Sequence, residues 1–331
     1  MRRFIFTLLA STLILCGCSQ DTSEESKEGT TEESIFQSDE AETSEVEASE
    51  EESSEDKSIE DLYQIPEGPI ELGGKVEQPS TDTGECVYDT ENMTAVADAI
   101  FAPYSITKYS GNKTKLIIPS EVDGIKILRI CPEVFYGNTK IEEIYIEDGI
   151  EGIEYGVFEK CISLKKIRLP STLKTISGDA FKDCINLKEI YIPDSVTKIG
   201  SSFVNCEKLE AVRIPQTTKL SPGAFEGCVS LKGEAIIPSG NEYVSQTYKD
   251  CTGITKVTIC EGPTRMFRHA FMGMTRLQEV IIPESIIEFD DVEDLFIDCK
   301  NLKVIYVKKD SYAEYIFRKS PWSDLVVSVG G

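Results

Sequence analysis

Eleven cysteines and one histidine are the side chains in this 331-residue chain with the strongest potential for metal, redox or nucleophilic chemistry. Six of the cysteines recur at a regular interval. Thiols stacked on successive coils would be too far apart for an unstrained disulfide, and a linear file cannot converge tetrahedrally on zinc. Because free cysteine is among the most buried residue types, we expect a structural layer. This cysteine column comprises Cys161, Cys184, Cys206, Cys228, Cys251 and Cys299.

The single histidine, His269, limits the catalytic sites that the chain could contain. A multi-histidine metal site is excluded, and a Ser-His-Asp or Cys-His site would need His269 itself. Equivalent positions elsewhere hold Asp179 and Gly223, which favours a polar surface turn. No glycine-rich phosphate loop and no paired-carboxylate motif stands out. We therefore expect no catalytic residue, no metal and no cofactor, and the chain is not predicted to be an enzyme.

The charge balance limits the partners. The formal net charge is −24, from 58 acidic and 34 basic side chains. Binding to nucleic acid depends on a basic surface, and so does adhesion to an anionic lipid surface. We therefore expect neither nucleic acid nor a membrane surface as a partner of the folded part.

The first residues predict an exported protein. Arg2 and Arg3 precede an apolar stretch, Phe4–Leu15, that is too short to span a bilayer and suits a signal peptide. The stretch ends in Leu15-Cys16-Gly17-Cys18, which resembles the lipobox of bacterial lipoproteins. This resemblance implies that residues 1–17 are a signal peptide, that a lipid is attached to Cys18, and that the protein is anchored on the extracellular face of a bacterial cell. An ordinary cleaved signal peptide is the alternative.

An acidic segment follows. Residues 19–60 hold 17 acidic residues and two lysines, and large apolar residues are sparse. Such a segment cannot bury enough apolar surface to offset the entropy of ordering, so we expect a disordered tether over residues 18–60. A spacer between membrane and domain explains it fully, and an acidic partner-binding segment is the alternative.

From residue 104 the chain repeats itself. The unit reads Phe-x-x-Cys-x-x-Leu-x-x-Ile-x-Ile-Pro, as in residues 179–193, DAFKDCINLKEIYIP. A period of 22–25 residues is the signature of a solenoid. The unit's aromatic residues are Phe135, Phe158, Phe181, Phe203, Phe225, Tyr248, Phe271 and Phe296.

Each repeat predicts one short strand. The alternating Ile-x-Ile segment has one face in the core, and a proline ends most of these segments because proline cannot donate within a ladder. Stacking the coils gives a single parallel β-sheet of about nine short strands, with little helix except a C-terminal cap. The expected strands are 116–118, 144–146, 167–169, 190–192, 212–214, 235–237, 257–259, 280–282 and 305–307.

The repeat resembles the BspA-type, or Treponema-type, leucine-rich repeat over residues 104–310. Asn138 and Met274 depart from the pattern in the cysteine column, and Cys260 stands at a proline position. The resemblance implies a bacterial surface protein that adheres to host matrix proteins or to other cells.

Both ends of the array need caps. Residues 310–319 predict a helix with Asp310 or Ser311 as N-cap, stopped by Pro321, and Leu325–Val329 could add a strand. We expect residues 311–331 to be the C-terminal cap and residues 61–103 to be linker and N-terminal cap, with 61–84 as linker or loosely docked chain.

The strand position that faces outward is the candidate binding face. It is rich in tyrosine and arginine, which dominate interface hot spots, although tyrosine and isoleucine also simply suit strands. A protein ligand fits this face, a carbohydrate stacked on the tyrosines is the alternative, and a surface protein without a specific ligand is a third reading. A monomer is expected. The outer column consists of Tyr145, Arg168, Tyr191, Arg213, Ile236, Ile281 and Tyr306.

Overall fold

The computed structural model describes residues 68–97 and 104–330. The chain divides into two compact units, Met1–Ser54 and Glu55–Gly331, and all described residues belong to the second. The predicted signal peptide and acidic tether lie outside them. In the described part of the chain, no helix has both the length and the apolar composition needed to cross a bilayer.

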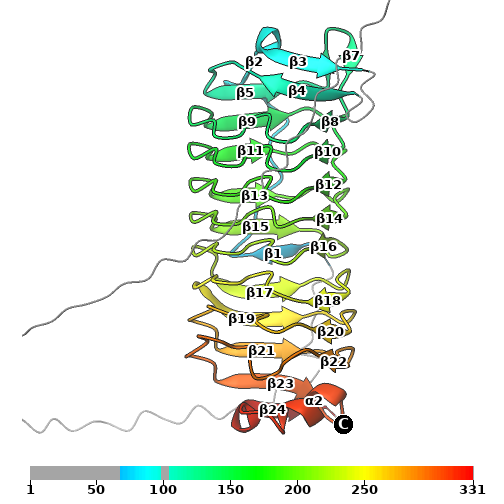
Figure 1. Cartoon of the computed structure of the whole chain (residues 1–331), viewed down its shortest axis with the longest axis vertical. Coiled ribbons are helices and arrows are strands. Elements are labelled where there is room, and N and C mark those ends of the chain that lie inside the picture. Colours follow the sequence, from blue (N-terminus) through cyan, green and yellow to red (C-terminus); the bar gives the residue numbers. More distant parts are fainter. Residues whose placement is uncertain (1–67, 98–103, 331) are drawn as a thin grey trace, which may run out of the picture. The chain divides into compact units, whose positions relative to one another are not determined.

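The second unit is a β-solenoid whose longer strands form one column, as predicted (Figure 1). Neighbouring strands in this first ladder run parallel wherever they pair with each other. All nine expected strands are present, and each lies within one to three residues of its predicted start. They are β5 (Lys115–Ile118), β9 (Glu143–Ile146), β11 (Lys166–Arg168), β13 (Glu189–Tyr191), β15 (Ala211–Ile214), β17 (Gly233–Ile237), β19 (Ile254–Ile259), β21 (Glu279–Ile282) and β23 (Val304–Lys308).

A second ladder, which we did not predict, lies on another side of the coils. The strands that the repeats contribute to it have two residues each, too short for an alternating pattern to be visible in the sequence. They come from the segment that precedes each aromatic residue, which reads Val-x-x-Ile in residues 196–199 and has other residues at these positions in the remaining coils. They are β8 (Arg129–Ile130), β10 (Gly152–Ile153), β12 (Thr175–Ile176), β14 (Lys198–Ile199), β16 (Lys219–Leu220), β18 (Tyr243–Val244), β20 (Arg265–Met266) and β22 (Glu288–Phe289).

The aromatic residues of successive coils stack inside the solenoid. From Phe135 to Tyr248 each ring lies near-parallel to the next, with centroids 5.2 to 5.7 Å apart. Phe271 and Phe296 form a second stacked pair with centroids 5.2 Å apart. These rings are 2 % exposed or less, and burying a side chain of this size contributes roughly 2–3 kcal/mol. No coil can bury its apolar stripe alone, so stability is a sum over neighbouring coils.

The residue two positions after each aromatic residue of the column has a left-handed backbone in every coil. This conformation reverses the chain after the ring and lets the next backbone amide bond within the turn. Glycine, asparagine and aspartate tolerate it best, which explains their frequency in this column. The residues are Gly137, Lys160, Asp183, Asn205, Gly227, Asp250, Gly273 and Asp298.

Caps close both ends of the array. At the N-terminal end, β3 (Met93–Val96) pairs antiparallel with β4 (Ser105–Tyr109), which joins the second ladder through β8, and β2 (Val87–Tyr88) extends the first ladder beside β5. A short hairpin of β6 (Glu121–Val122) and β7 (Ile125–Lys126) lies beside this cap. At the C-terminal end, helix α2 (Tyr312–Phe317) and strand β24 (Val326–Val329) follow β23, as predicted.

The helix begins as the sequence indicates. Ser311 is the N-cap, and its side-chain oxygen accepts a hydrogen bond from the backbone amide of Glu314 at 3.2 Å. The Glu314 carboxylate in turn accepts from the backbone amide of Asp310 at 2.7 Å. This reciprocal cap offsets the short length of the helix.

At Gly137 a Cβ atom would meet no atom within 4 Å, so a substitution there causes backbone strain without a steric clash. This position therefore measures the energetic cost of the left-handed conformation alone. We expect Gly137→Val to lower the free energy of unfolding by about 1–2 kcal/mol, because left-handed backbone is strained for a β-branched residue. Gly137→Asn should cost clearly less. Urea denaturation followed by circular dichroism measures both, and equal losses would contradict the assignment.

Candidate functional site

The outer column begins with a compact run of four residues. Tyr145 of β9 lies opposite Arg168 of β11, and Tyr191 of β13 lies opposite Arg213 of β15. The strands alternate, so the flanking isoleucines point into the core while these four side chains point away from it. The structure therefore places Tyr145, Arg168, Tyr191 and Arg213 on one face, as the sequence predicts.

Each of these tyrosines is engaged by an arginine. The guanidinium carbon of Arg168 lies 4.4 Å from the Tyr145 ring centroid, and that of Arg213 lies 4.5 Å from the Tyr191 centroid. Arg213 also donates to the carbonyl of Ile192 at 2.7 Å and to Asp194 at 2.6 Å. A cation–π pair of this kind contributes about 0.5–2 kcal/mol, depending on desolvation. The face is thus pre-organised, with one side of each ring occupied.

Three residues of the outer column are less accessible than expected. Arg213 is 6 % exposed, Ile236 is 8 % exposed and Ile281 is fully buried. Ile281 packs with Val329 of β24 and with Tyr306. The expectation that the whole column is open to solvent is therefore wrong, and the accessible part consists of the half-buried Tyr145, Arg168, Tyr191 and Tyr306.

The first ladder is interrupted in a way that the sequence did not reveal. Among the described strands, β11 does not pair with β13, and β15 does not pair with β17. At the second interruption strand β1 (Ile70–Leu72) lies between β15 and β17 and pairs antiparallel with β15 (Figure 1). Ile70 is fully buried and Leu72 is 2 % exposed. The prediction of a linker or loosely docked chain is wrong here, since these residues belong to the core.

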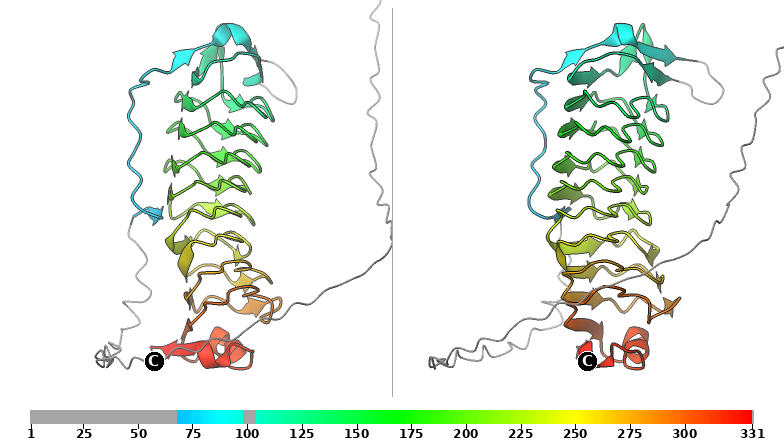
Figure 2. Two further views of the ribbon diagram at one scale, coloured as in Figure 1. Left: turned by 90° about the vertical axis from the view of Figure 1, so that its left-hand side faces the viewer. Right: turned by 60° about the vertical axis from the view of Figure 1, so that its left-hand side comes forward.

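Residues 73–86 form a strap that runs beside the coils from β1 to the N-terminal cap (Figure 2). Val76 is buried and anchors the strap, and its backbone amide donates to the Glu71 carboxylate at 2.6 Å. Most other strap residues are polar and exposed. Tyr88, just beyond the strap, donates its hydroxyl to Glu147, and this bond raises the pKa of Tyr88. The upper end of the strap therefore borders the outer column.

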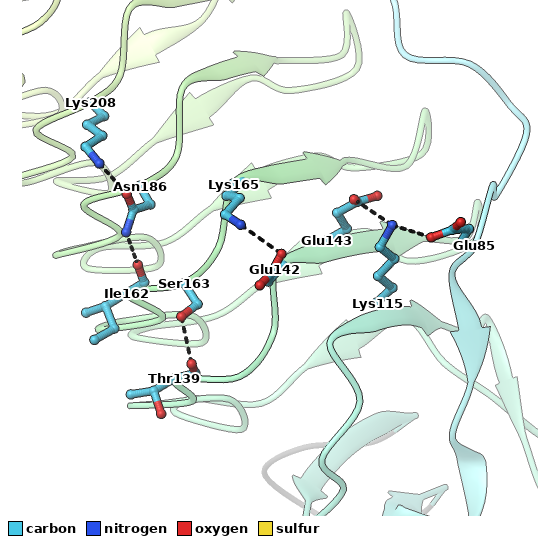
Figure 3. A network of polar contacts seen from close by, with 10 residues as sticks. All are labelled: Glu85, Lys115, Thr139, Glu142, Glu143, Ile162, Ser163, Lys165, Asn186 and Lys208. Atoms are coloured by element: carbon cyan, nitrogen blue, oxygen red, sulfur yellow. Dashed lines mark hydrogen bonds and ion pairs between the residues drawn. The ribbon is translucent and has the colours of Figure 1, made fainter.

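Paired charges occupy the surface around the strap's upper end (Figure 3). Lys115 bridges Glu85, at 2.6 Å, and Glu143, at 3.1 Å, and these contacts raise the pKa of Lys115. Lys165 pairs with Glu142 of the preceding coil at 2.8 Å. The Lys115–Glu143 and Lys165–Glu142 pairs join adjacent coils, as cross-strand pairs do, and the Lys115–Glu85 pair joins the strap to a coil. This charged surface is therefore largely satisfied within the chain.

The cysteine column is a structural layer, as expected. All six residues are buried, and each thiol donates to the carbonyl of the aromatic residue in the preceding coil at 2.9 to 3.2 Å. Burial raises the pKa of Cys161 and of Cys299 to about 12. The nine cysteines that the structure describes are free, Cys86 and Cys131 included, whereas Cys16 and Cys18 lie outside the described residues.

His269 occupies a surface turn, as predicted. Its backbone is left-handed, like that of Asp179 and Gly223, and its Nε2 lies 3.7 Å from the Asp294 carboxylate. Over residues 68–97 and 104–330, no group of three or more His, Cys, Asp or Glu side chains could hold a metal ion.

The sequence contains two signals of the interruption that the repeat period does not predict. Ile70-Glu71-Leu72 alternates like a repeat strand and is flanked by glycine and proline. Tyr248 stands alone as tyrosine in the aromatic column. Its buried hydroxyl donates at 2.9 Å to the carbonyl of Ile236 in β17. Tyr248 marks the coil at which the ladder separates, whereas the 70–72 segment indicates a strand without showing where it packs.

Residues 128–248 and 218–328 match the model of the BspA type leucine rich repeat region, in six copies. The chain belongs to the BspA-type leucine-rich-repeat family. Three solved structures are similar to this chain, and their sequence identity, coverage and TM-score are as follows. A Treponema pallidum leucine rich repeat protein is 26 % identical, with 52 % of this chain and 82 % of that chain covered and a TM-score of 0.47.

A leucine rich cell surface protein from Faecalibacterium prausnitzii is 18 % identical, with 76 % of this chain and 96 % of that chain covered and a TM-score of 0.34. The pneumococcal vaccine antigen PcpA is 17 % identical, with 70 % of this chain and 80 % of that chain covered and a TM-score of 0.30. No curated protein matches the chain.

Thiol reactivity should follow burial. In the native protein we expect iodoacetamide to modify the half-buried Cys86 and Cys131 first, because the cysteine column is buried and its thiols have raised pKa values. Denaturant should expose all six column thiols. Mass spectrometry of timed alkylation samples measures the order, and early labelling of Cys206 would contradict a closed core.

Proposed function

We propose that this protein is a bacterial cell-surface lipoprotein that presents its solenoid for protein–protein recognition or adhesion, to host matrix proteins or to other cells. The observation that carries the proposal is the pre-organised run of tyrosine and arginine on the first ladder. The chain's membership of the BspA-type repeat family supports it, since the resemblance to BspA-like proteins implies adhesion. Rigid aromatic and guanidinium groups give large contact area at low entropic cost.

A carbohydrate ligand is less well supported by the same geometry. A sugar stacks on a free aromatic face, but Arg168 covers one side of Tyr145 and Arg213 covers one side of Tyr191. Guanidinium and phenol groups together instead suit carboxylates, backbone carbonyls and aromatic side chains of a protein partner. We therefore favour a protein ligand for the outer column.

The anchor part of the proposal rests on the first residues alone. Arg2 and Arg3, the apolar stretch and Cys18 in its lipobox-like setting support export and lipid attachment. The acidic composition of residues 18–60 supports a spacer between that anchor and the solenoid.

Removing the accessible tyrosines tests the outer column. The full chain with Tyr145, Tyr191 and Tyr306 all changed to Ser should bind any protein ligand from a matrix-protein panel about tenfold or more weakly, because such aromatic anchors each contribute on the order of 1–2 kcal/mol. Surface plasmon resonance measures the affinity, and circular dichroism checks the fold.

The matched control changes three exposed tyrosines elsewhere, Tyr136, Tyr155 and Tyr312, to Ser. This control should bind like the unmodified chain. Equal affinity for both triple variants would exclude the outer column as the site, and binding confined to a glycan array would favour the carbohydrate alternative.

Lipid attachment is tested at its expected residue. In a bacterial host, Cys18→Ala should abolish incorporation of a clickable fatty acid and shift the protein from the membrane fraction to the medium, because one sulfur carries the anchor. Cys16→Ala is the matched control and should keep the label. Retained label in Cys18→Ala would show that another residue is modified.

A further inference from the structure

We propose that Arg168 is the recognition residue of the outer column and that it binds an acidic side chain of the protein partner. This inference rests on the proposed function and deepens it, because it names the chemistry of the segment that the outer column takes. It is carried by a contrast between the two Tyr–Arg pairs of the column. The pairs have the same composition and ring geometry, but their arginines are paired to very different degrees.

The guanidinium of Arg213 is held at short distance by the chain itself. Its Nη1 donates to the carbonyl of Ile192 at 2.7 Å, and its Nη2 donates to Asp194 at 2.6 Å. The side chain is 7 % exposed, and strand β1 places Glu71 opposite it. Because both nitrogens of its fork are already occupied, Arg213 has a structural role.

The guanidinium of Arg168 is almost as buried but poorly paired. Its side chain is 12 % exposed, yet Nη1 reaches the carbonyl of Ile146 only at 3.4 Å and Nη2 lies 3.9 Å from Asp148. No other hydrogen bond or ion pair joins this guanidinium to the described residues. A buried charge is costly unless a counter-charge and hydrogen bonds compensate it. A ligand carboxylate that completes the pairing therefore gains more here than at an exposed arginine.

The sequence keeps Asp148 from closing on Arg168. The Oδ1 atom of Asp148 accepts a hydrogen bond from the backbone amide of Ser171 at 2.6 Å and another from the Ser171 hydroxyl at 3.0 Å. In the other Tyr–Arg pair the position of Ser171 holds Gln216, and among the described residues no hydrogen bond joins it to Asp194. Asp194 is therefore available to its arginine, whereas Asp148 is held by the next coil.

A second cation lies beside Arg168 on the outward face. Lys166 precedes it by two positions on β11, so both side chains point away from the core. Lys166 is exposed, and no ion pair joins it to a described residue, since its register partner Glu143 pairs with Lys115 at 3.1 Å. Strand β13 does not pair with β11, and its exposed Glu189 makes no ion pair with β11. The break in the ladder thus leaves two cations on β11 for an acidic ligand.

The neighbouring rings define the rest of the ligand. Tyr145 packs against Arg168, and Tyr191 lies on the next strand, both half-buried. A protein segment that carries aspartate or glutamate beside an apolar residue satisfies the guanidinium and the rings together. The two oxygens of one carboxylate match the planar fork of an arginine, which a lysine does not provide.

The test selects binders of the full chain from a phage library of random peptides, in parallel with Arg168→Gln and with Arg129→Gln. Arg129→Gln is the matched control, because it removes an exposed arginine from the second ladder. Peptides enriched on the unmodified chain and on the control should carry aspartate or glutamate. This acidic enrichment should disappear on Arg168→Gln, and circular dichroism checks the fold of each variant.

The most enriched acidic peptide then measures the pairing by fluorescence anisotropy. It should bind Arg168→Gln about tenfold or more weakly than the unmodified chain, as expected for a hydrogen-bonded charge pair. Changing the acidic residue of the peptide to its amide should lose as much, and the two changes together should cost little beyond either alone. Arg168→Lys should recover only part of the affinity, because lysine lacks the planar fork.

Asp148→Asn gives a readout that a merely structural Arg168 would not move. The variant keeps a side-chain oxygen for Ser171 and removes the competing charge, so the acidic peptide should bind about twofold or more tightly. Unchanged or weaker binding to Asp148→Asn, with native circular dichroism, would overturn the assignment of Arg168 as an incompletely paired anchor.

The selection also separates this inference from the proposed function. Peptides that need Tyr145, Tyr191 and Tyr306 but lack an acidic residue and bind Arg168→Gln normally would overturn the acidic partner and leave the outer column as the binding face. Peptides that bind the triple tyrosine variant and Arg168→Gln as well as the unmodified chain would overturn both. A selection that yields no acidic peptide dependent on Arg168 would equally overturn the inference.

Discussion

Every coil of this protein depends on its neighbour for the partners of its buried backbone groups. A coil of 22–25 residues has strands too short to pair within itself, so its amides and carbonyls bond to the coils before and after it. The stacked rings, the thiols that donate to carbonyls and the paired surface charges all lie along the same axis. An unpaired buried backbone group costs about 1–3 kcal/mol, so any separation of two coils has to be compensated.

The boundary between β15 and β17 shows how that compensation is made. Asn241 and Tyr248 supply side-chain partners, and Ile70 and Leu72 supply apolar surface from a segment that is distant in the sequence. The solenoid is thus not a uniform array. At the interruption, β1 pairs with β15 over only three residue pairs, and the chain leaves β1 through an exposed connection. The Ile70 and Leu72 side chains are nevertheless buried as in a core.

The sequence predicted most of what repeats and little of what does not. The nine strands of the first ladder, the cysteine layer and the N-cap at Ser311 all follow from periodic or local patterns. The two-residue strands of the second ladder were missed because alternation cannot be seen in two residues. Strand β1 was missed because its partner is distant in the chain, and the exposure of Ile281 was overestimated because packing by Val329 lies outside the repeat pattern.

The central claim is that residues 70–72 are an integral strand of the solenoid, placed where two coils separate. Hydrogen–deuterium exchange of the full chain, followed by mass spectrometry of overlapping peptides, tests it most directly. The account predicts that peptides containing Ile70–Leu72 exchange slowly, on the time scale of those from β15, while peptides from the strap exchange fast. Exchange of residues 70–72 as fast as that of the strap would contradict it.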